Sequence, residues 1–305
     1  MHLSLQEWQN AHKLKLQSPK IAWPTVLLFF TGLIIFAASS ILAVRHVLPV
    51  SVAFIINVLM RFLMFTILHD ASHRSLSQIS WLNETIGTIA AFILTPIAGI
   101  RVFRFIHMQH HRFTNESIEK DPDYWAAQGS KWLLPLRWMF LDLHYIYWYL
   151  HHWNTRPRKE HLELILIILT AVSVISVLTS YGFGFWVVFL WLISGRIASA
   201  ALVMTFDFLP HYPHDVTAKE NEYRATNLKP NLSWLMTPLL LSQNYHLIHH
   251  LYPRIPFYRY AWVWRNARNP LLLSGARLMR WNGKEIENGQ YEHHPMDKSV
   301  NSTCF

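Results

Sequence analysis

Histidine is the residue type in this sequence best suited to chemistry, and much of it is gathered into three short clusters. They read HDASH from His69 to His73, HMQHH from His107 to His111, and HLIHH from His246 to His250. Residues three and four apart share one face of a helix, so each cluster would point its imidazoles in one direction. Neutral imidazole is a good ligand for iron, copper and zinc, and eight such ligands suit two ions rather than one. The eight candidates are His69, His73, His107, His110, His111, His246, His249 and His250.

A metal site has to be weighed against plainer roles for these clusters. One HxxxH pair alone is more often a surface or capping pair. Here three clusters each follow an apolar segment on the same predicted side, which favours one shared site. A bis-histidine haem would need single histidines facing each other within the spans. A divalent-metal transporter would place His, Asp and Glu along the middle of its spans, and the interiors of the predicted spans carry none.

Membrane-spanning helices are the elements predicted to position the clusters. The 305 residues are 52% hydrophobic and only 15% charged, a composition that favours a membrane protein. Small residues at 37–40 could end a signal peptide, but a polar leader and several later spans favour a retained helix. Four apolar stretches can cross a hydrocarbon core of about 30 Å. They lie at about 21–44, 49–68, 162–181 and 183–206.

Short connections at Arg45–Pro49 and Gly182 would fold these spans into two hairpins. All three clusters and both termini then lie on one side of the membrane. Basic residues in the leader, Met1–Lys20, make that side cytosolic by the positive-inside rule. In a bacterium the membrane would be the inner, cytoplasmic one.

A cytosolic cap is predicted between residues 101 and 160, where the chain is polar, aromatic and basic. The apolar stretch 85–100 is too short to cross comfortably, so it is predicted to be interfacial or re-entrant. The fold expected is an all-α integral membrane protein with four transmembrane helices in two hairpins and a helical cap holding the metal site. This domain covers residues 1–282, and 283–305 form a polar tail. The cap aromatics expected in a membrane-surface belt are Trp125, Trp132, Trp138, Tyr145, Tyr147, Trp148 and Tyr149.

Charge and cysteine content exclude several other functions. The net charge is +9, but Lys and Arg are scattered beside apolar runs rather than gathered in one arm, so nucleic acid is not expected as a partner. The single cysteine, Cys304, excludes an intrachain disulfide and an iron–sulfur cluster held by this chain alone. The sequence has no GxGxxG motif and no βαβ pattern for a dinucleotide. Any reductant must therefore come from outside the chain.

The motifs HDASH, HMQHHRFTN and QNYHLIHHLYP resemble the three histidine boxes of the membrane fatty acid desaturase superfamily. The resemblance covers nearly the whole chain and implies a helical stem in lipid with a cytosolic cap that holds two iron ions. By position, the eight box histidines resemble the family's metal ligands. A ninth ligand often follows the fourth span, where His211 stands, with His214 as the alternative. His211 follows the span directly, whereas His214 lies beyond Pro213 and is predicted to face solvent.

The resemblance implies cleavage of an unactivated C–H bond in a long apolar lipid, with O2 as co-substrate, which acid or base side chains alone cannot achieve. The product is either a double bond or an alcohol. FDFLPHYPHD (206–215) and SQNYHLIHHLYPRIPFYRY (242–260) also resemble bacterial carotenoid ring hydroxylases. Fatty acyl desaturation and carotenoid ring hydroxylation both stay open, with the acyl substrate favoured because it prevails across the superfamily. A metal-binding membrane protein without catalytic activity is disfavoured because no box has lost a histidine.

The partners implied are a lipid substrate, a membrane and an external electron donor with its reductase. The donor would be a ferredoxin-like protein or a small cytochrome, and a basic cytosolic face suits an acidic carrier.

Other polar residues receive lesser roles. Asp70, Asp207 and Asp215 are candidate acceptors for the N–H groups of ligating imidazoles, with a surface or capping role as the alternative for each. Arg61 and Arg196 interrupt the spans and are predicted to snorkel toward the headgroups. Surface positions are predicted for His144, His151, His152, His293 and His294.

Overall fold

The computed structural model of the chain describes residues 3–287, which form helices and loops without an extended strand. This confirms the prediction of an all-α chain with four long apolar helices. Their insertion into a membrane stays a prediction that rests on length and composition. The helices long and apolar enough to span a bilayer are α2 (Trp23–Val44), α3 (Val50–Ser72), α8 (Arg158–Ser180) and a composite helix, Gly184–His211.

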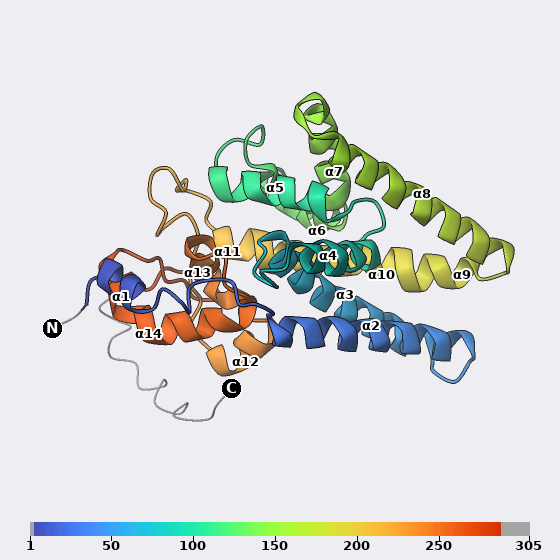
Figure 1. Cartoon of the computed structure of the whole chain (residues 1–305), viewed down its shortest axis with the longest axis horizontal. Coiled ribbons are helices and arrows are strands. Elements are labelled where there is room, and N and C mark those ends of the chain that lie inside the picture. The colour runs from blue at the N-terminus through green and yellow to red at the C-terminus, as the bar shows by residue number, and fades with distance from the viewer. Residues whose placement is uncertain (1–2, 288–305) are drawn as a thin grey trace.

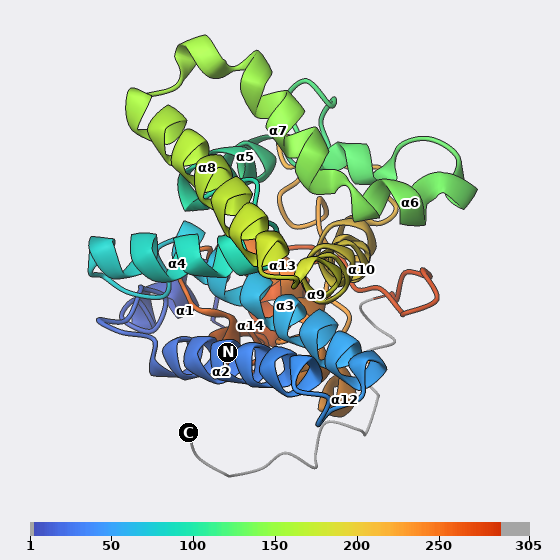
Figure 2. The ribbon, with the colours of Figure 1, turned by 90° about the vertical axis from the view of Figure 1, so that its right-hand side faces the viewer.

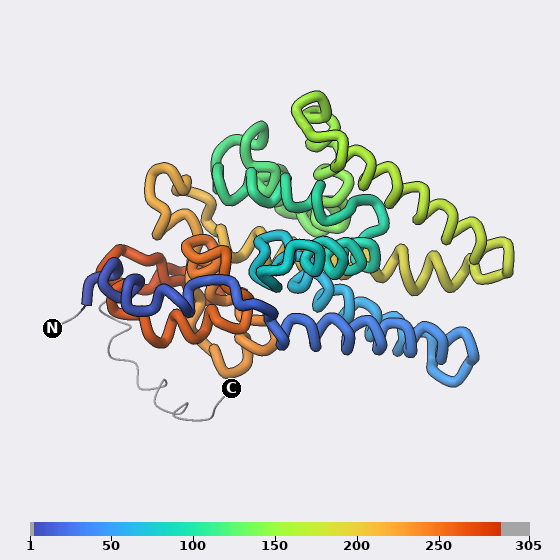
Figure 3. Tube along the Cα trace, viewed as in Figure 1, coloured from blue at the N-terminus to red at the C-terminus, as the bar shows by residue number. Residues whose placement is uncertain are grey.

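The four long helices extend from one half of the molecule toward the same end (Figure 1). The turns that join α2 to α3 and α8 to α9 both lie at that end (Figure 3). The opposite end carries α1 (Leu5–Ala11), α13 (His246–Leu251) and α14 (Tyr260–Leu273), which share a hydrophobic core. Viewed from the end with the turns, α6 (Leu134–Met139) and α7 (Leu141–His151) lie on the side away from α2 (Figure 2).

Two of the predicted spans end later than their hydropathy indicated. The second was expected to stop at residue 68, but α3 runs on to Ser72, and the fourth continues past 206 to His211. Backbone hydrogen bonds, rather than side-chain hydropathy, set the end of a helix. His69, the first histidine of the first cluster, and His211 are therefore held in the last turns of long helices instead of in loops. The fourth helix consists of α9 (Gly184–Trp186), η4 (Val187–Ile193), α10 (Ser194–Leu202), η5 (Val203–Phe208) and α11 (Leu209–His211).

The outer faces of the long helices carry large apolar side chains. Ile34 on α2 is 64% exposed and Leu166 on α8 is 60% exposed. Contiguous apolar surface of this kind is rare on soluble monomers and marks a surface covered by lipid or protein. The exposure therefore supports the prediction that these helices lie in a bilayer.

The stretch 85–100 is a helix followed by a turn. Here α4 (Ser80–Leu94) ends at Leu94, and α5 begins at Ile100. Arg61, in the middle of α3, is fully buried and donates from Nη1 to the Leu94 carbonyl oxygen at 3.0 Å. The last carbonyls of a helix lack partners within it and attract a cation. The prediction that Arg61 snorkels is therefore wrong, because its guanidinium caps the buried end of α4.

Arg196 on α10 also fails to snorkel. Its Nη1 donates to Asp142 Oδ1 at 2.6 Å and to the Met139 carbonyl oxygen at 2.9 Å. An ion pair with α7 satisfies this cation inside the protein, so it has no need to reach the headgroups.

The aromatic side chains of residues 101–160 do not all form a surface belt. Trp132 is 93% exposed, as predicted, but Trp138, Trp148 and Tyr149 are buried. The indole of Trp138 donates to the Ala126 carbonyl oxygen at 2.9 Å, which ties η1 (Pro122–Ala127) to α6. These three aromatic residues therefore form the interior of the region expected to be the cap.

Of the five histidines predicted to lie on the surface, His151 is exposed. His144 stacks on Trp125 with ring centroids 4.8 Å apart, and His152 stacks on Trp148 at 3.8 Å. Both are half-buried, so the surface prediction is wrong for them. His293 and His294 lie outside the described residues.

The two turns at one end and the histidine helices at the other lead to a topology prediction. Tags on the leader, near Asn154 and at the C-terminus should all be accessible from the cytosol, because one shared site requires all three histidine boxes on one side. Tags inserted at the 45–49 and Gly182 turns should be accessible only from outside. Protease protection in sealed vesicles measures this, and a leader and C-terminus on opposite sides would contradict it.

Candidate metal centre

Nine histidines, the eight of the boxes and His211, converge near the ends of α3 and of the composite helix that lie away from the two turns. They form two groups, in each of which one nitrogen of every ring lies within 4.8 Å of the others. His214 is in neither group. The first consists of His69, His73, His107, His111 and His249, and the second of His110, His211, His246 and His250.

Distances within the groups match those of imidazoles that share an ion. In the first group His249 Nε2 lies 3.0 Å from His69 Nε2 and 2.8 Å from His111 Nε2. In the second, His250 Nε2 lies 3.1 Å from His246 Nε2 and 3.3 Å from His211 Nε2. Two nitrogens each about 2.1 Å from one ion, at a right angle, lie about 3.0 Å apart. The geometry therefore fits one ion in each group.

Protonation also favours metal binding. Burial, followed by the nearby histidines, lowers the pKa of His107, His111 and His249 well below the usual range, so these rings are neutral at pH 7. Neutral imidazole is the form that binds a metal. The buried Nε2 of His73 has no hydrogen-bond partner among residues 3–287, and a buried nitrogen left this way is costly unless a cation satisfies it.

Each histidine is positioned by the end of a helix. His69 occupies the last turn of α3 and His73 is its C-cap, while α5 (Ile100–Phe113) carries the second box and α13 the third. His211 ends the fourth long helix directly after η5, which is π-helical. A π-helical segment changes which way the following residues face relative to a regular helix, and such segments often occur at functional sites.

The Nδ1 atoms of four histidines are held by neighbours outside the two groups. His110 Nδ1 donates to Asp121 Oδ1 at 2.9 Å, and His246 Nδ1 donates to Gln243 Oε1 at 3.0 Å. His249 Nδ1 lies 3.0 Å from the hydroxyl of Tyr260, which is fully buried. The fourth bond runs from His211 Nδ1 to the backbone carbonyl oxygen of Asp207. These bonds leave Nε2 free to face a metal ion, an arrangement typical of histidine ligands.

None of the carboxylates predicted to orient a ligand does so. Asp70 accepts from the Thr25 hydroxyl and the Phe257 N–H, and Asp215 pairs with Arg277 at 2.7 Å. Asp207 bonds His211 through its backbone rather than its carboxylate. Spacing along the chain could not reveal the partners of Asp70 and Asp215, because Thr25, Phe257 and Arg277 are distant from them in sequence.

The sequence patterns did not predict the carboxylates that lie at the site, Asp121 and Asp123. They stand in the sequence DPD shortly after the second box, and an acidic pair so close to a histidine box is a signal that could have identified them. Burial alone would lower the pKa of His110, but the charges of Asp123 and Asp121 outweigh it and raise that pKa to about 9. The same negative charge would stabilise a metal ion bound by the second group.

His214 does not face solvent, which corrects the prediction for it. Its ring is half-buried beside Phe208 and Tyr124, and its Nδ1 lies 3.4 Å from Asn115 Oδ1. Burial lowers its pKa to about 4. The ring packs behind His211 rather than among the nitrogens of either group.

Replacing Asp121 by asparagine should weaken metal binding in the second group about 10- to 100-fold. Its carboxylate accepts from His110 Nδ1, from the Asn115 N–H at 2.7 Å and from the Asp123 N–H at 3.0 Å. Asparagine has one acceptor oxygen in place of two, so its NH2 cannot accept the bonds made to the other oxygen, and the amide carries no charge. Metal analysis after challenge with a chelator should show about half of the wild-type content retained.

Glu116→Gln is the matched control, because within residues 3–287 the Glu116 carboxylate pairs with the exposed Lys120, at 2.7 Å, and with no other cation. It should retain the full metal content. Equal metal loss from both variants would mean that Asp121 has no specific role in holding His110.

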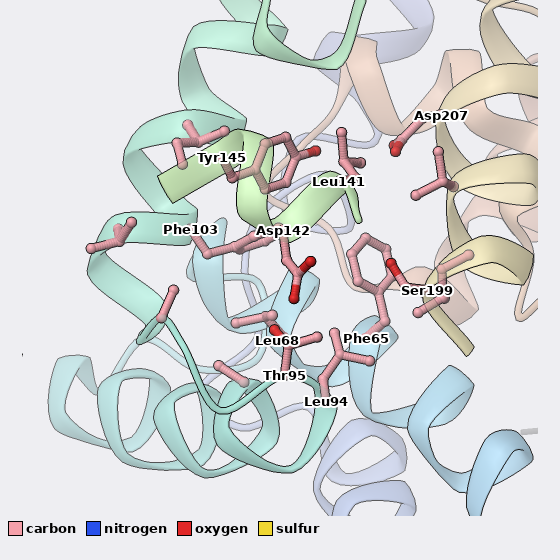
Figure 4. A pocket seen from close by; sticks show the side chains of 16 residues that line it. Phe65, Leu68, Leu94, Thr95, Phe103, Leu141, Asp142, Tyr145, Ser199 and Asp207 are labelled. Carbon is pink, nitrogen blue, oxygen red and sulfur yellow. The ribbon is translucent and has the colours of Figure 1, made fainter. Parts of the chain in front are cut away.

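A largely apolar pocket adjoins the first group. Phe103 stacks on His107 with ring centroids 5.3 Å apart, Phe65 lies 5.9 Å from His69, and both line the pocket. Asp142, Tyr145 and Asp207 project among the apolar side chains (Figure 4). Apolar lining residues come from α3, α4, α5, α7, the fourth long helix and the turn before α5, including Leu68, Leu94, Ala98, Val102, Leu141 and Leu202.

The chain belongs to the fatty acid desaturase family, whose model matches residues 45–281. It is 27% identical over 219 residues to an sn-1 oleoyl-lipid 12-desaturase of Picosynechococcus sp., covering 64% of this chain and 62% of that protein. It is 27% identical over 241 residues to an endoplasmic reticulum omega-3 fatty acid desaturase of Vigna radiata, covering 68% and 62%. A dihydrorhizobitoxine desaturase of Bradyrhizobium elkanii is 24% identical over 218 residues, covering 63% and 60%. The chain thus matches about three fifths of the length of these relatives.

Proposed function

We propose that this protein is a membrane-bound desaturase that introduces a double bond into the fatty acyl chain of a lipid, with two iron ions and O2. The observation that carries the proposal is the apolar pocket that reaches the first histidine group at Phe65 and Phe103. Apolar pockets with a few polar groups are typical ligand sites. Relatives that act as lipid or fatty acid desaturases support the same conclusion.

The two histidine groups would hold the iron ions, five ligands in the first and four in the second. Imidazole suits iron, whereas side-chain acids and bases cannot break an unactivated C–H bond. When bound, the two ions supply the activation of O2 that this oxidation requires. The overall reaction removes two hydrogens from adjacent CH2 groups and, with two further electrons and two protons, reduces O2 to two molecules of water.

The chain's own residues would contribute positioning and exclusion of water. Phe65 and Phe103 would hold an acyl chain beside the histidines, with Leu68 and Val102 also lining the pocket. A dry, shaped pocket fixes which carbon atoms lie beside the metal ions and prevents side reactions. The two further electrons must come from a separate carrier, a ferredoxin-like protein or small cytochrome with its reductase, because the chain has a single cysteine and no dinucleotide motif.

We further propose that residues 1–282 form the catalytic domain, with the site on the cytosolic side of the membrane, and that 283–305 are a polar tail. The family match, which ends at residue 281, supports the boundary between the domain and the tail.

The test compares a host that expresses the protein with one that expresses His110→Ala. Acyl chain and pigment profiles should show new unsaturated acyl chains only with the intact protein, and purified intact protein should hold about two irons per chain. His110→Ala should lose much of this metal but remain in the membrane, because His110 lies on α5, outside the four long apolar helices. Hydroxylated carotenoids without new unsaturated acyl chains, or full activity with stoichiometric zinc, would contradict the proposal.

A further inference from the structure

A second pocket lies beside the loop that follows the end of α3. It has a volume of about 250 Å³, which is room for a phosphate group with part of its hydration, at about 30 Å³ for each water. Its lining is polar and includes no carboxylate. The lining residues are Gln17, Ser18, Arg74, Ser77, Gln78, Ser80 and Arg254.

Hydrogen bonds between three distant segments build the walls of this pocket. The Ser18 hydroxyl donates to the Arg254 carbonyl oxygen at 3.0 Å, and Gln78 Nε2 donates to the Ser18 carbonyl oxygen at 2.7 Å. The Ser77 hydroxyl donates to the Lys20 carbonyl oxygen at 2.6 Å. The leader, the loop after α3 and the loop after the third box are thereby fixed together, so the pocket is preorganised rather than a gap between mobile loops.

The charge of the pocket is positive and uncompensated. Neither the Arg74 nor the Arg254 guanidinium forms a hydrogen bond or ion pair within residues 3–287. Arg74 also has φ of +55° just after the C-cap of α3, a position that glycine usually occupies. A non-glycine residue in this conformation costs conformational free energy, which is consistent with a function for the arginine side chain. Guanidinium groups bind phosphate oxygens in a two-pronged geometry.

The pocket lies at the level expected for the membrane surface. Trp23, the first residue of α2, is 60% exposed, and Trp81, near the start of α4, is 66% exposed. Exposed tryptophan side chains at the ends of spanning helices are typical of the headgroup region. Ser80, which lines the pocket, directly precedes Trp81, and Lys20 lies just before α2. The pocket therefore opens where phospholipid phosphates would be found.

We propose that this pocket binds the phosphate of a phospholipid headgroup through Arg74 and Arg254. Arg74 directly follows His73, and Arg254 follows the third histidine box closely, so a bound headgroup would brace the two loops that leave the histidine helices. The proposal concerns binding alone and does not depend on the reaction proposed for the protein.

The experiment uses the iron-loaded full chain in neutral detergent with two probes, phosphatidylglycerol and inorganic phosphate. Binding of each is measured by native mass spectrometry and calorimetry for wild type and for Arg74→Gln/Arg254→Gln. The double variant should bind phosphatidylglycerol at least about tenfold more weakly, because two charge-assisted contacts are lost. Lys13→Gln/Lys219→Gln removes the same charge at exposed positions outside the pocket and should bind like wild type.

Gln17→Glu, which adds a carboxylate to the pocket wall, provides a second test if the double variant fails to retain iron or elutes as an aggregate. It should also bind phosphatidylglycerol about tenfold more weakly. If the double variant loses binding of inorganic phosphate but binds phosphatidylglycerol like wild type, the ligand of the pocket is free phosphate. That result would overturn the proposal that the pocket binds a lipid headgroup. Wild-type affinity for both probes in the double variant, or in Gln17→Glu, would overturn the site itself.

Discussion

Replacing His211 by alanine should lower lipid oxidation by at least about a hundredfold, while His214→Ala should retain most of it. His211 contributes Nε2 to the second group, 3.3 Å from His250 Nε2, at the end of a long helix. Loss of a residue that only orients a ligand costs about 10- to 100-fold, so loss of a ligand should cost more. His214 packs behind this ring, near Asn115, outside both groups.

The measurement is the rate of double-bond formation together with iron content for each purified variant. His211→Ala should lose iron from the second group, whereas His214→Ala should keep the wild-type content. Replacing the buried ring of His211 or the half-buried ring of His214 costs stability as well, so the melting temperature of both variants is the control for folding. A large loss of iron in His214→Ala alone would move the ninth ligand to that position.

The sequence predicted the long helices and the convergence of the histidines because both depend on local patterns. Runs of apolar residues such as the one before His69 identify a span, and spacings of three and four place imidazoles on one helical face. Which nitrogens come close enough to share an ion depends on how α3, α5, α11 and α13 meet. His110 falls in a different group from its box neighbours His107 and His111, and no spacing along one helix reveals that division.

Long-range contacts account for what the sequence could not predict. Arg61 lies in an apolar run, and only its hydrogen bond to Leu94, on another helix, explains why a cation is buried there. Asp70 is predicted to accept from the N–H group of a ligating imidazole, but folding brings Thr25 and Phe257 to its carboxylate. Hydropathy likewise carries no information about the π-helical segment η5 that precedes His211.

Replacing Ala98 by phenylalanine should lower kcat/KM for a long acyl substrate about 10- to 100-fold while iron content stays at the wild-type level. Ala98 lies in the turn before α5, lines the apolar pocket and is half-buried. A phenyl ring there would occupy space that an acyl chain needs. Even one methylene in a hydrophobic pocket changes discrimination by about 10- to 200-fold. The loss should be smaller for shorter acyl chains, which leave the blocked end of the pocket empty.

Ile97→Phe provides the matched control, since Ile97 is the neighbouring residue in the same turn but does not line the pocket. Both variants place a phenyl ring in the same turn. Only Ala98→Phe should alter the dependence of kcat/KM on acyl chain length, measured with substrates of graded length. If the two variants behave alike, or if Ala98→Phe oxidises long chains at the wild-type rate, the acyl chain does not occupy this pocket. The histidine centre would then remain a candidate oxidation site, and its substrate would have to approach from another direction.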